Sequence, residues 1–149
     1  MSHTFTKIYV HAIFSTAARA PLIVDDIRDS LHAYLGGIVR QMGGTAVAVG
    51  GTADHVHMLL DLPSGVSLAE CMRVVKTNSS KWVHLKWPAR EFEWQRGYGG
   101  FTVSASARQA VTSYIAGQEG HHARVSFEEE FRAFLRKHGV RFEEGHIFD

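Results

Sequence analysis

The segment TADHVHMLLDLP, residues 52–63, has the pattern of a buried strand and also carries two histidines. Side chains of a strand alternate between its two faces, so His55 and His57 share one face while Val56 and Met58 share the other. The Val56 face is apolar throughout and is typical of a protein core. We therefore expect the two histidines to lie next to each other, on the face of the sheet that points away from the core.

Segments on both sides of this strand show the periodicities of helices and strands. In chain order, these patterns predict a strand at 5–14, a helix at 27–42, strands at 45–51 and 55–62, a helix at 68–87, a strand at 91–106, and helices at 106–118 and 127–139. Two helices begin with the capping-box pattern Ser-x-x-Glu, at Ser67 with Glu70 and at Ser126 with Glu129. In the first of these two helices, we expect Leu85 to point inward.

The order of the first six elements matches the split βαβ, or ferredoxin-like, arrangement. We therefore predict an α+β fold with an antiparallel sheet, helices packed on one face, and additional helices at the C-terminus. The second face of such a sheet is expected to be open, to be covered by a partner or used for binding. The length of the chain favours a single domain over residues 1–149.

The composition is that of an ordinary globular protein, with 45% hydrophobic residues and a formal net charge of +1. This charge neither requires nor excludes nucleic acid, because a basic patch can be local. Cys71 is the single cysteine, which excludes an internal disulfide and a cysteine zinc cluster. Neither a membrane-spanning apolar run nor a signal-peptide pattern is present, so a cytoplasmic protein without membrane contact is expected.

Two neighbouring imidazoles on one strand face can bind one cation, although a third ligand is needed. The alternative is that two histidines simply occupy a strand. The motif YIAGQ bears on this choice, because Tyr114 and Gln118 share a helix face one turn apart and are followed by His121 and His122. Here the alternative is that Tyr114 packs against the sheet while Gln118 contacts solvent.

Together, these residues resemble the single-tyrosine HUH transposases of bacterial insertion sequences, which move as single-stranded DNA. The family markers are His-hydrophobic-His in a central strand, here His55-Val56-His57, and a helix with a tyrosine and a glutamine four residues later, here Tyr114 and Gln118. Further segments that resemble these proteins, in order, are IYVHAIFST, AVGGTADHVHMLLDLP, VKTNSSKWVH, FEWQRGYGGFTVS and FRAFLRKHGV. The resemblance covers nearly the whole chain.

The resemblance implies a homodimer, a divalent metal and a 5′-phosphotyrosine intermediate formed by Tyr114. The expected metal ligands are His55, His57 and Gln118, which leave coordination positions open for substrate. Imidazole ligands alone favour Zn²⁺, but we expect Mg²⁺ or Mn²⁺ as in the family, because phosphoryl oxygens and water complete the shell. In the family the tyrosine helix of one subunit can complete the site of the other, and the sequence leaves open which subunit supplies Tyr114.

The expected substrate is single-stranded DNA with hairpin ends. Basic side chains contact phosphates, and aromatic rings can stack on unpaired bases. The candidate DNA-binding residues are Arg19, Arg73, Lys76, Asn78, Lys81, Arg96 and Tyr98. For each lysine, the alternative is a solvated helix face.

Two other functions are compatible with the same motifs. A metal-dependent phosphodiester hydrolase would use the histidines with an activated water and Asp54 or Asp61 as base, and it predicts turnover without a covalent adduct. A non-mobile relative would bind single-stranded or hairpin DNA without cutting it, as ferredoxin-like sheets often do. Such a protein would bind hairpins equally well with and without metal.

Overall fold

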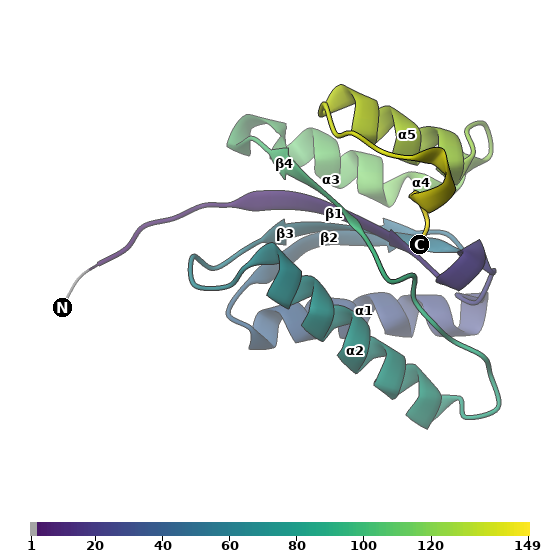
Figure 1. The fold of residues 1–149 in the computed structure, drawn as a ribbon. Helices are drawn as coiled ribbons and strands as arrows, with labels where there is room; N and C mark the ends of the chain where they lie inside the picture. Colours follow the sequence, from purple (N-terminus) through teal and green to yellow (C-terminus); the bar gives the residue numbers. More distant parts are fainter. Residues whose placement is uncertain (1–2) are drawn as a thin grey trace.

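The fold is built on one antiparallel sheet with helices on both of its faces (Figure 1). The computed structural model describes residues 3–149. The strands are β1 (Tyr9–Ser15), β2 (Thr45–Gly51), β3 (His55–Asp61) and β4 (Gly99–Val103). Their order across the sheet is β2-β3-β1-β4, so β1 and β3 occupy its centre. The predicted antiparallel, ferredoxin-like α+β arrangement is confirmed.

One face of the sheet packs on α1 (Asp25–Gln41) and α2 (Leu68–Lys86), which lie beneath it in Figure 1. Val56, Met58 and Leu60 of β3 point to these helices and are 0% exposed. The alternation along β3 therefore places its apolar side chains in the larger hydrophobic core, as predicted.

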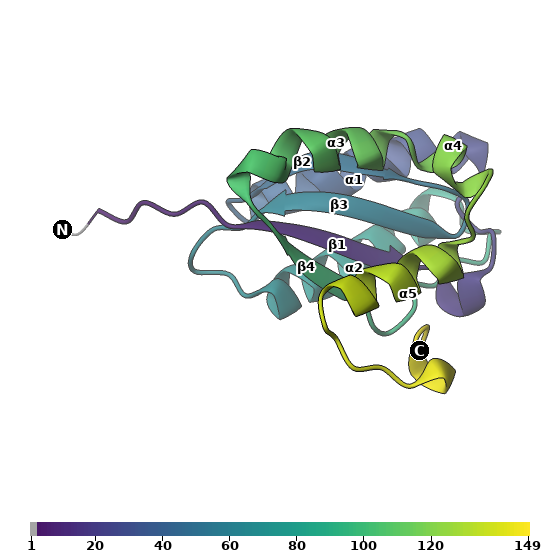
Figure 2. The same ribbon diagram turned by 90° about the horizontal axis from the view of Figure 1, so that it is seen from above.

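The opposite face is covered by three helices of the same chain. They are α3 (Arg108–Ala116), α4 (Gln118–His122) and α5 (Phe127–Lys137). Figure 2 shows α3 running along β2 and β3, with α5 on the side of β4. The prediction of an open face was wrong: Phe127, Phe131 and Leu135 of α5 form a second apolar cluster with Ile13 and Phe101. The apolar stripe of an amphipathic helix needs a partner, and the sheet provides one.

At both predicted helix starts the serine caps the helix. Ser67 Oγ accepts a hydrogen bond from the backbone N–H of Glu70 at 3.1 Å, and Ser126 Oγ accepts one from Glu129 at 3.2 Å. These bonds satisfy backbone donors that the first helical turn leaves free.

The inward direction predicted for Leu85 was wrong, because this side chain is 84% exposed. The buried stripe of α2 runs through Met72, Val75 and Val83. Leu85 follows Val83 by two positions, about 200° around the helix axis, and so faces solvent.

Three element boundaries differ from the prediction. The first strand begins at Tyr9, and Phe5 is 92% exposed. The segment 91–106 is a strand only over β4, apart from one isolated bridge between Thr16 and Trp94. The helix predicted through Gln118 ends one residue before Gly117, so the tyrosine and glutamine lie on consecutive helices. Within residues 3–149, none of the helices is long and apolar enough to cross a membrane.

Candidate active site

The three C-terminal helices place polar side chains directly over the histidines of β3. His55 and His57 are 0% exposed, Gln118 of α4 is 1% exposed and Glu130 of α5 is 3% exposed. Tyr114 of α3 is partly buried beside them. Because buried polar groups need partners, these side chains have to satisfy one another.

The backbone of α3 approaches β2 closely at Gly50. A Cβ atom on Gly50 would lie 2.3 Å from the carbonyl oxygen of Ile115, which is far too close for any side chain. A glycine here lets the helix backbone rest on the strand. Since Ile115 follows Tyr114, this contact sets the height of the phenol above the sheet.

Hydrogen bonds at the β2–β3 turn orient His55. Its Nδ1 lies 2.8 Å from Asp54 Oδ1 and 3.1 Å from Thr52 Oγ1. Burial opposes the charge of Asp54, but hydrogen bonds from His55 and Thr52 outweigh burial and hold the pKa of this carboxyl below its ordinary value. An ionised carboxylate only accepts hydrogen bonds, so we assign the hydrogen of His55 to Nδ1, and Nε2 of the neutral ring presents a lone pair.

His122 is oriented in the same manner. Its Nδ1 donates to the backbone carbonyl of Val125 at 2.7 Å, which leaves a lone pair on Nε2 of the neutral ring. This Nε2 lies 2.9 Å from Gln118 Oε1 and 3.1 Å from Glu130 Oε1. Gln118 Oε1 also lies 3.1 Å from Nε2 of His55, and its amide nitrogen donates to Glu130 Oε2 at 3.2 Å. The amide oxygen thus points at two imidazoles.

His57 lies between His11 of β1 and Glu130. Its Nδ1 is 2.7 Å from His11 Nε2, and its Nε2 is 2.9 Å from Glu130 Oε1. Burial lowers the pKa of His57 to about 4 and that of His11 to about 3, so both rings are neutral near pH 7. Burial opposes the charge on Glu130, but hydrogen bonds from His57 and Tyr114 outweigh it and keep the pKa of this carboxyl below its ordinary value.

Tyr114 completes the cluster from α3. Its hydroxyl donates a hydrogen bond to Glu130 Oε2 and lies 3.3 Å from His121 Nε2. Its ring meets the ring of His57 edge-on, with the centroids 5.9 Å apart. Burial and the hydrogen bond to Glu130 raise the pKa of Tyr114 above the ordinary value of a phenol. The tyrosine and the histidine pair therefore meet within one chain.

The cluster has the donor set of a cation site. Four atoms that can bind a cation converge: His55 Nε2, His122 Nε2, Gln118 Oε1 and Glu130 Oε1. In a neutral ring of either histidine the hydrogen is on Nδ1, which faces an acceptor outside this group. The metal-binding atoms of His55, His57, His122 and Glu130 all lie within 4.8 Å of one another. Facing lone pairs repel, whereas a cation between them is coordinated by both. This buried His/Glu group could bind a metal ion.

His11, His122 and Glu130 belong to the site, although no sequence motif assigned them to it. A signal for Glu130 was present, because it occupies an inward position of the apolar stripe of α5, between Phe127 and Phe131. A lone carboxylate on such a stripe is expected only where it has buried partners.

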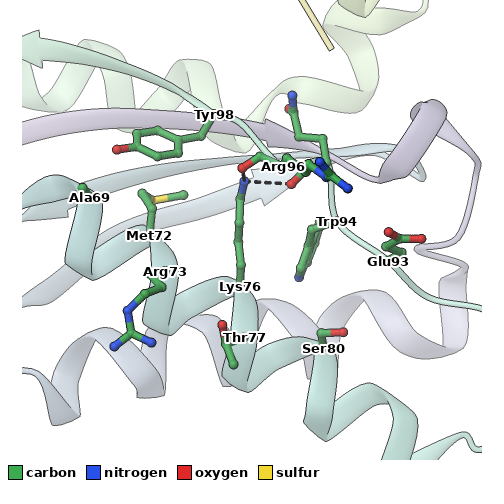
Figure 3. Close-up of a pocket in the computed structure, with 11 residues that line it drawn as sticks. Ala69, Met72, Arg73, Lys76, Thr77, Ser80, Glu93, Trp94, Arg96 and Tyr98 are labelled. Carbon is green, nitrogen blue, oxygen red and sulfur yellow. Dashed lines mark hydrogen bonds between the residues drawn. The ribbon is translucent and has the colours of Figure 1, made fainter. Parts of the chain in front are cut away.

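Four predicted DNA-binding residues lie on α2, on the far side of the sheet from the histidines (Figure 1). They are Arg73, Lys76, Asn78 and Lys81. The structure brings Arg73 and Lys76 together with Arg96 and Tyr98 in a groove between α2 and the segment 93–98 (Figure 3).

The ammonium group of Lys76 is engaged by the backbone. It donates hydrogen bonds to the carbonyls of Gln95 at 2.9 Å and Arg96 at 3.2 Å (Figure 3). It also donates one to the carbonyl of Gly97. Burial lowers the pKa of Lys76 to about 8. Lys76 therefore holds the loop that forms one wall of the groove, whereas Arg73 is exposed and paired with a carboxylate of its own helix.

Arg19 does not line this groove. Its guanidinium group lies 2.5 Å from Glu128 of α5 and 4.9 Å above the ring of Phe148. The seven candidate DNA-binding residues are thus not gathered on one surface.

Comparisons with known proteins match this chain to transposases. The profile of the family described as "Transposase IS200 like" matches residues 4–118. The ISDra2 transposase TnpA of Deinococcus radiodurans is 25% identical over 118 residues, which are 75% of this chain and 84% of that protein. The transposase for insertion sequence element IS200 of Salmonella typhimurium is 26% identical over 125 residues, covering 79% of this chain and 81% of that protein.

Two solved structures resemble the fold. A crystal structure of a transposase from Deinococcus radiodurans R1 has a TM-score of 0.65 and 26% identity, and the match covers 79% of this chain and 95% of that one. A REP-associated tyrosine transposase bound to a REP hairpin has a TM-score of 0.59 at 17% identity, with 84% and 76% covered, and supports the fold alone. The family match spans both central strands and includes the histidine pair, Tyr114 and Gln118. This chain therefore belongs to the IS200-like transposase family.

Proposed function

We propose that this transposase cuts and rejoins single-stranded DNA through a covalent bond between Tyr114 and a 5′ phosphate. The observation that carries the proposal is the position of the phenol, beside the buried histidine pair of its own chain. Attack on a phosphodiester requires that the nucleophile and the phosphate be held together, and a phenol next to a cation site fulfils this requirement. The arrangement supports Tyr114 acting in cis with His55 and His57.

In the proposed step, Tyr114 Oη forms a bond to phosphorus while the bond from phosphorus to the 3′ oxygen of the preceding nucleotide breaks. The phenol loses one proton and the departing oxygen gains one, which leaves a 5′-phosphotyrosine and a free 3′-OH. Because the phosphodiester is retained in the covalent link, attack by another 3′-OH rejoins the DNA without a nucleotide cofactor.

The proposed metal ligands are His55, His57 and Gln118, with Mg²⁺ or Mn²⁺ as the ion. When bound, such an ion supplies Lewis-acid polarisation of a phosphate oxygen. The contribution of the chain is to hold the ligand atoms ready. Asp54 and Thr52 orient His55 so that its Nε2 faces Gln118 within the cluster.

We propose that the substrate carries hairpin ends, as in the related protein whose structure contains a REP hairpin. The proposed contacts are Arg19, Arg73, Asn78, Lys81, Arg96 and Tyr98, with Lys76 supporting the groove wall. The groove and the histidines lie on opposite faces of the sheet, which would separate DNA recognition from DNA cleavage. We further propose a cytoplasmic homodimer in which residues 1–149 form one domain.

The decisive experiment is Tyr114→Phe, assayed with single-stranded hairpin DNA and Mg²⁺ on a denaturing gel. We expect the protein–DNA adduct to disappear while DNA binding, measured by gel shift, is retained. The control is Tyr34→Phe on α1, whose ring stacks on Trp82 away from the cluster. An adduct that survives Tyr114→Phe would reject Tyr114 as the nucleophile.

The same gel distinguishes the two alternative functions. Cleaved DNA without an adduct in the wild-type protein would favour a hydrolase, and binding without cleavage would favour a non-mobile relative. The candidate bases of a hydrolase both have other partners, since Asp54 orients His55 and Asp61 lies 2.8 Å from Lys7 Nζ. These contacts favour strand transfer.

A further inference from the structure

We propose that Glu130 is an anionic ligand of the divalent ion and the positioning residue for Tyr114. The inference rests on the proposed function for the chemistry of Tyr114. The ligand role is tested without DNA and is therefore independent of that function.

The charge of Glu130 lacks a permanent counter-ion. Burying a carboxylate costs several kcal/mol unless it is paired. Among residues 3–149, the ion-pair partners of Glu130 are histidines and include neither lysine nor arginine. The nearest of them is His57, whose Nε2 lies 2.9 Å from Glu130 Oε1. A divalent cation at the convergence of the imidazoles would neutralise this carboxylate.

The separations of the ligand atoms fit one ion. Glu130 Oε1 lies 2.9 Å from His57 Nε2, 3.1 Å from His122 Nε2 and 3.9 Å from His55 Nε2. With metal–ligand distances near 2.1 Å, neighbouring ligands of an octahedral ion are about 3.0 Å apart and opposite ligands about 4.2 Å apart. All three separations lie within this range, so the three histidines and Glu130 could hold one ion together.

A carboxylate also explains how a histidine site could hold Mg²⁺ or Mn²⁺. These ions prefer oxygen ligands, whereas a site of imidazoles favours softer metals. With Glu130 and Gln118, the protein supplies two oxygen atoms besides the histidines. The preference of the site therefore moves toward the harder ions.

The second carboxylate oxygen links the ion site to the nucleophile. Glu130 Oε2 accepts the hydrogen bond of the Tyr114 hydroxyl and one from the Gln118 amide at 3.2 Å. If Glu130 Oε1 held the ion, Oε2 would fix the position of the Tyr114 hydroxyl relative to it. Such an arrangement controls reaction rate through geometry.

The ligand role is tested by Mn²⁺ titration of the full-length protein without DNA, followed by electron paramagnetic resonance. We expect Glu130→Gln to raise the dissociation constant for Mn²⁺ about tenfold or more, because an anionic ligand is lost. The matched control is Glu129→Gln, one residue earlier on the exposed side of α5, and it should bind Mn²⁺ like the wild type. Equal affinity of the Glu130→Gln and Glu129→Gln proteins would overturn the ligand role.

The positioning role is tested by the rate of adduct formation at saturating Mn²⁺. The amide oxygen of Glu130→Gln still accepts the hydrogen bond of Tyr114, so high Mn²⁺ should restore most of its rate. Glu130→Ala removes this acceptor, and its rate should stay roughly 100-fold below wild type. If Glu130→Ala reacts as fast as Glu130→Gln, the positioning role is wrong.

Circular dichroism establishes that each variant is folded. Should Glu130→Gln fail to fold, Glu130→Asp replaces it, because a shorter side chain that keeps the charge should weaken Mn²⁺ binding and slow the adduct. Unchanged values for both quantities would refute the proposal. If wild-type protein forms no adduct with any DNA while Glu130→Gln loses Mn²⁺, the proposed function fails and the ligand role stands.

Discussion

The two faces of the sheet are made from the same strands but differ in chemistry. Toward α1 and α2, β3 presents Met58 and its apolar neighbours to a large hydrophobic core. Toward α3–α5, the alternate positions of β3 present His55 and His57 to buried polar side chains. A single strand can thus supply a core and a reactive site, because its side chains alternate.

The two faces contribute differently to stability and to the chemistry of the site. The side chains on the α1–α2 face are apolar, so they are stabilised by burial and close packing and need no hydrogen-bond partners. The α3–α5 face also contains an apolar cluster around Phe131, but at its centre the histidines and Glu130 depend on mutual hydrogen bonds. We therefore expect changes on the first face to act on folding, and changes on the second to act on metal binding, pH dependence and reaction rate.

The largest expected effect is on the apolar face. Met58→Ala should lower the free energy of unfolding by about 2–5 kcal/mol, because it leaves a cavity under a fully buried position. Urea denaturation measures this change. Leu85→Ala is the control and should change stability by less than about 0.5 kcal/mol, since Leu85 is 84% exposed. An equal loss in both variants would contradict the assigned core.

Lowering the pH should destabilise the protein through the titratable groups that are buried on the α3–α5 face. His57 and His11, with pKa values lowered to about 4 and about 3 from 6.5, bind protons more readily in the unfolded chain. Their contribution to stability is complete above about pH 6.5 and is lost as the pH falls toward these values, by up to about 1.4 kcal/mol per pH unit for each histidine. The lowered pKa of Glu130 acts in the same direction below its ordinary value of 4.5.

Urea denaturation of metal-free protein between about pH 7 and pH 4 measures this dependence. His11→Phe should make the curve shallower by the share of one histidine. Stability that does not change over this range would show that the two rings are not buried as neutral groups.

Substitution of Lys76 tests whether the groove between α2 and the segment 93–98 depends on the hydrogen bonds that Lys76 donates to backbone carbonyls. Lys76→Met should destabilise the protein by about 1–3 kcal/mol, because three backbone carbonyls lose a charged donor. Arg73→Met, one turn away, should destabilise the protein far less than Lys76→Met, because the Arg73 ion pair is exposed. Chemical denaturation measures the loss of stability in both variants. Equal losses would show that Lys76 stabilises the protein no more than an exposed charge does.

The smallest expected effect concerns the distance between α3 and the sheet. Gly50→Ala should slow adduct formation roughly tenfold, because the new methyl group displaces the backbone that carries Tyr114. Gly37→Ala on α1 meets no atom within 4 Å and should leave the rate unchanged while stabilising the helix by about 0.5–1 kcal/mol. A normal adduct rate in Gly50→Ala would show that α3 can shift without moving the phenol.

Much of the fold was predictable because it depends on local periodicity. Alternation placed the strand at 55–62 correctly within one residue, and serine–glutamate spacing located the starts of two helices. The predicted site residues His55, His57, Tyr114 and Gln118 meet in the structure, although their catalytic and metal-binding roles stay predictions. The sequence did not predict that helices of the same chain cover the second face, because the apolar stripe of a helix does not indicate which surface it packs on.

Sequence spacing alone indicated which residues share a strand or helix face, since these relations depend only on neighbouring positions and backbone geometry. It thereby established the histidine pair and the division of β3 into an apolar and a polar side. Helix packing in three dimensions brings Glu130 to this pair and places backbone carbonyls around the ammonium group of Lys76. Such meetings depend on how helices pack across a sheet, for example on the close approach at Gly50, and no spacing along the chain encodes them.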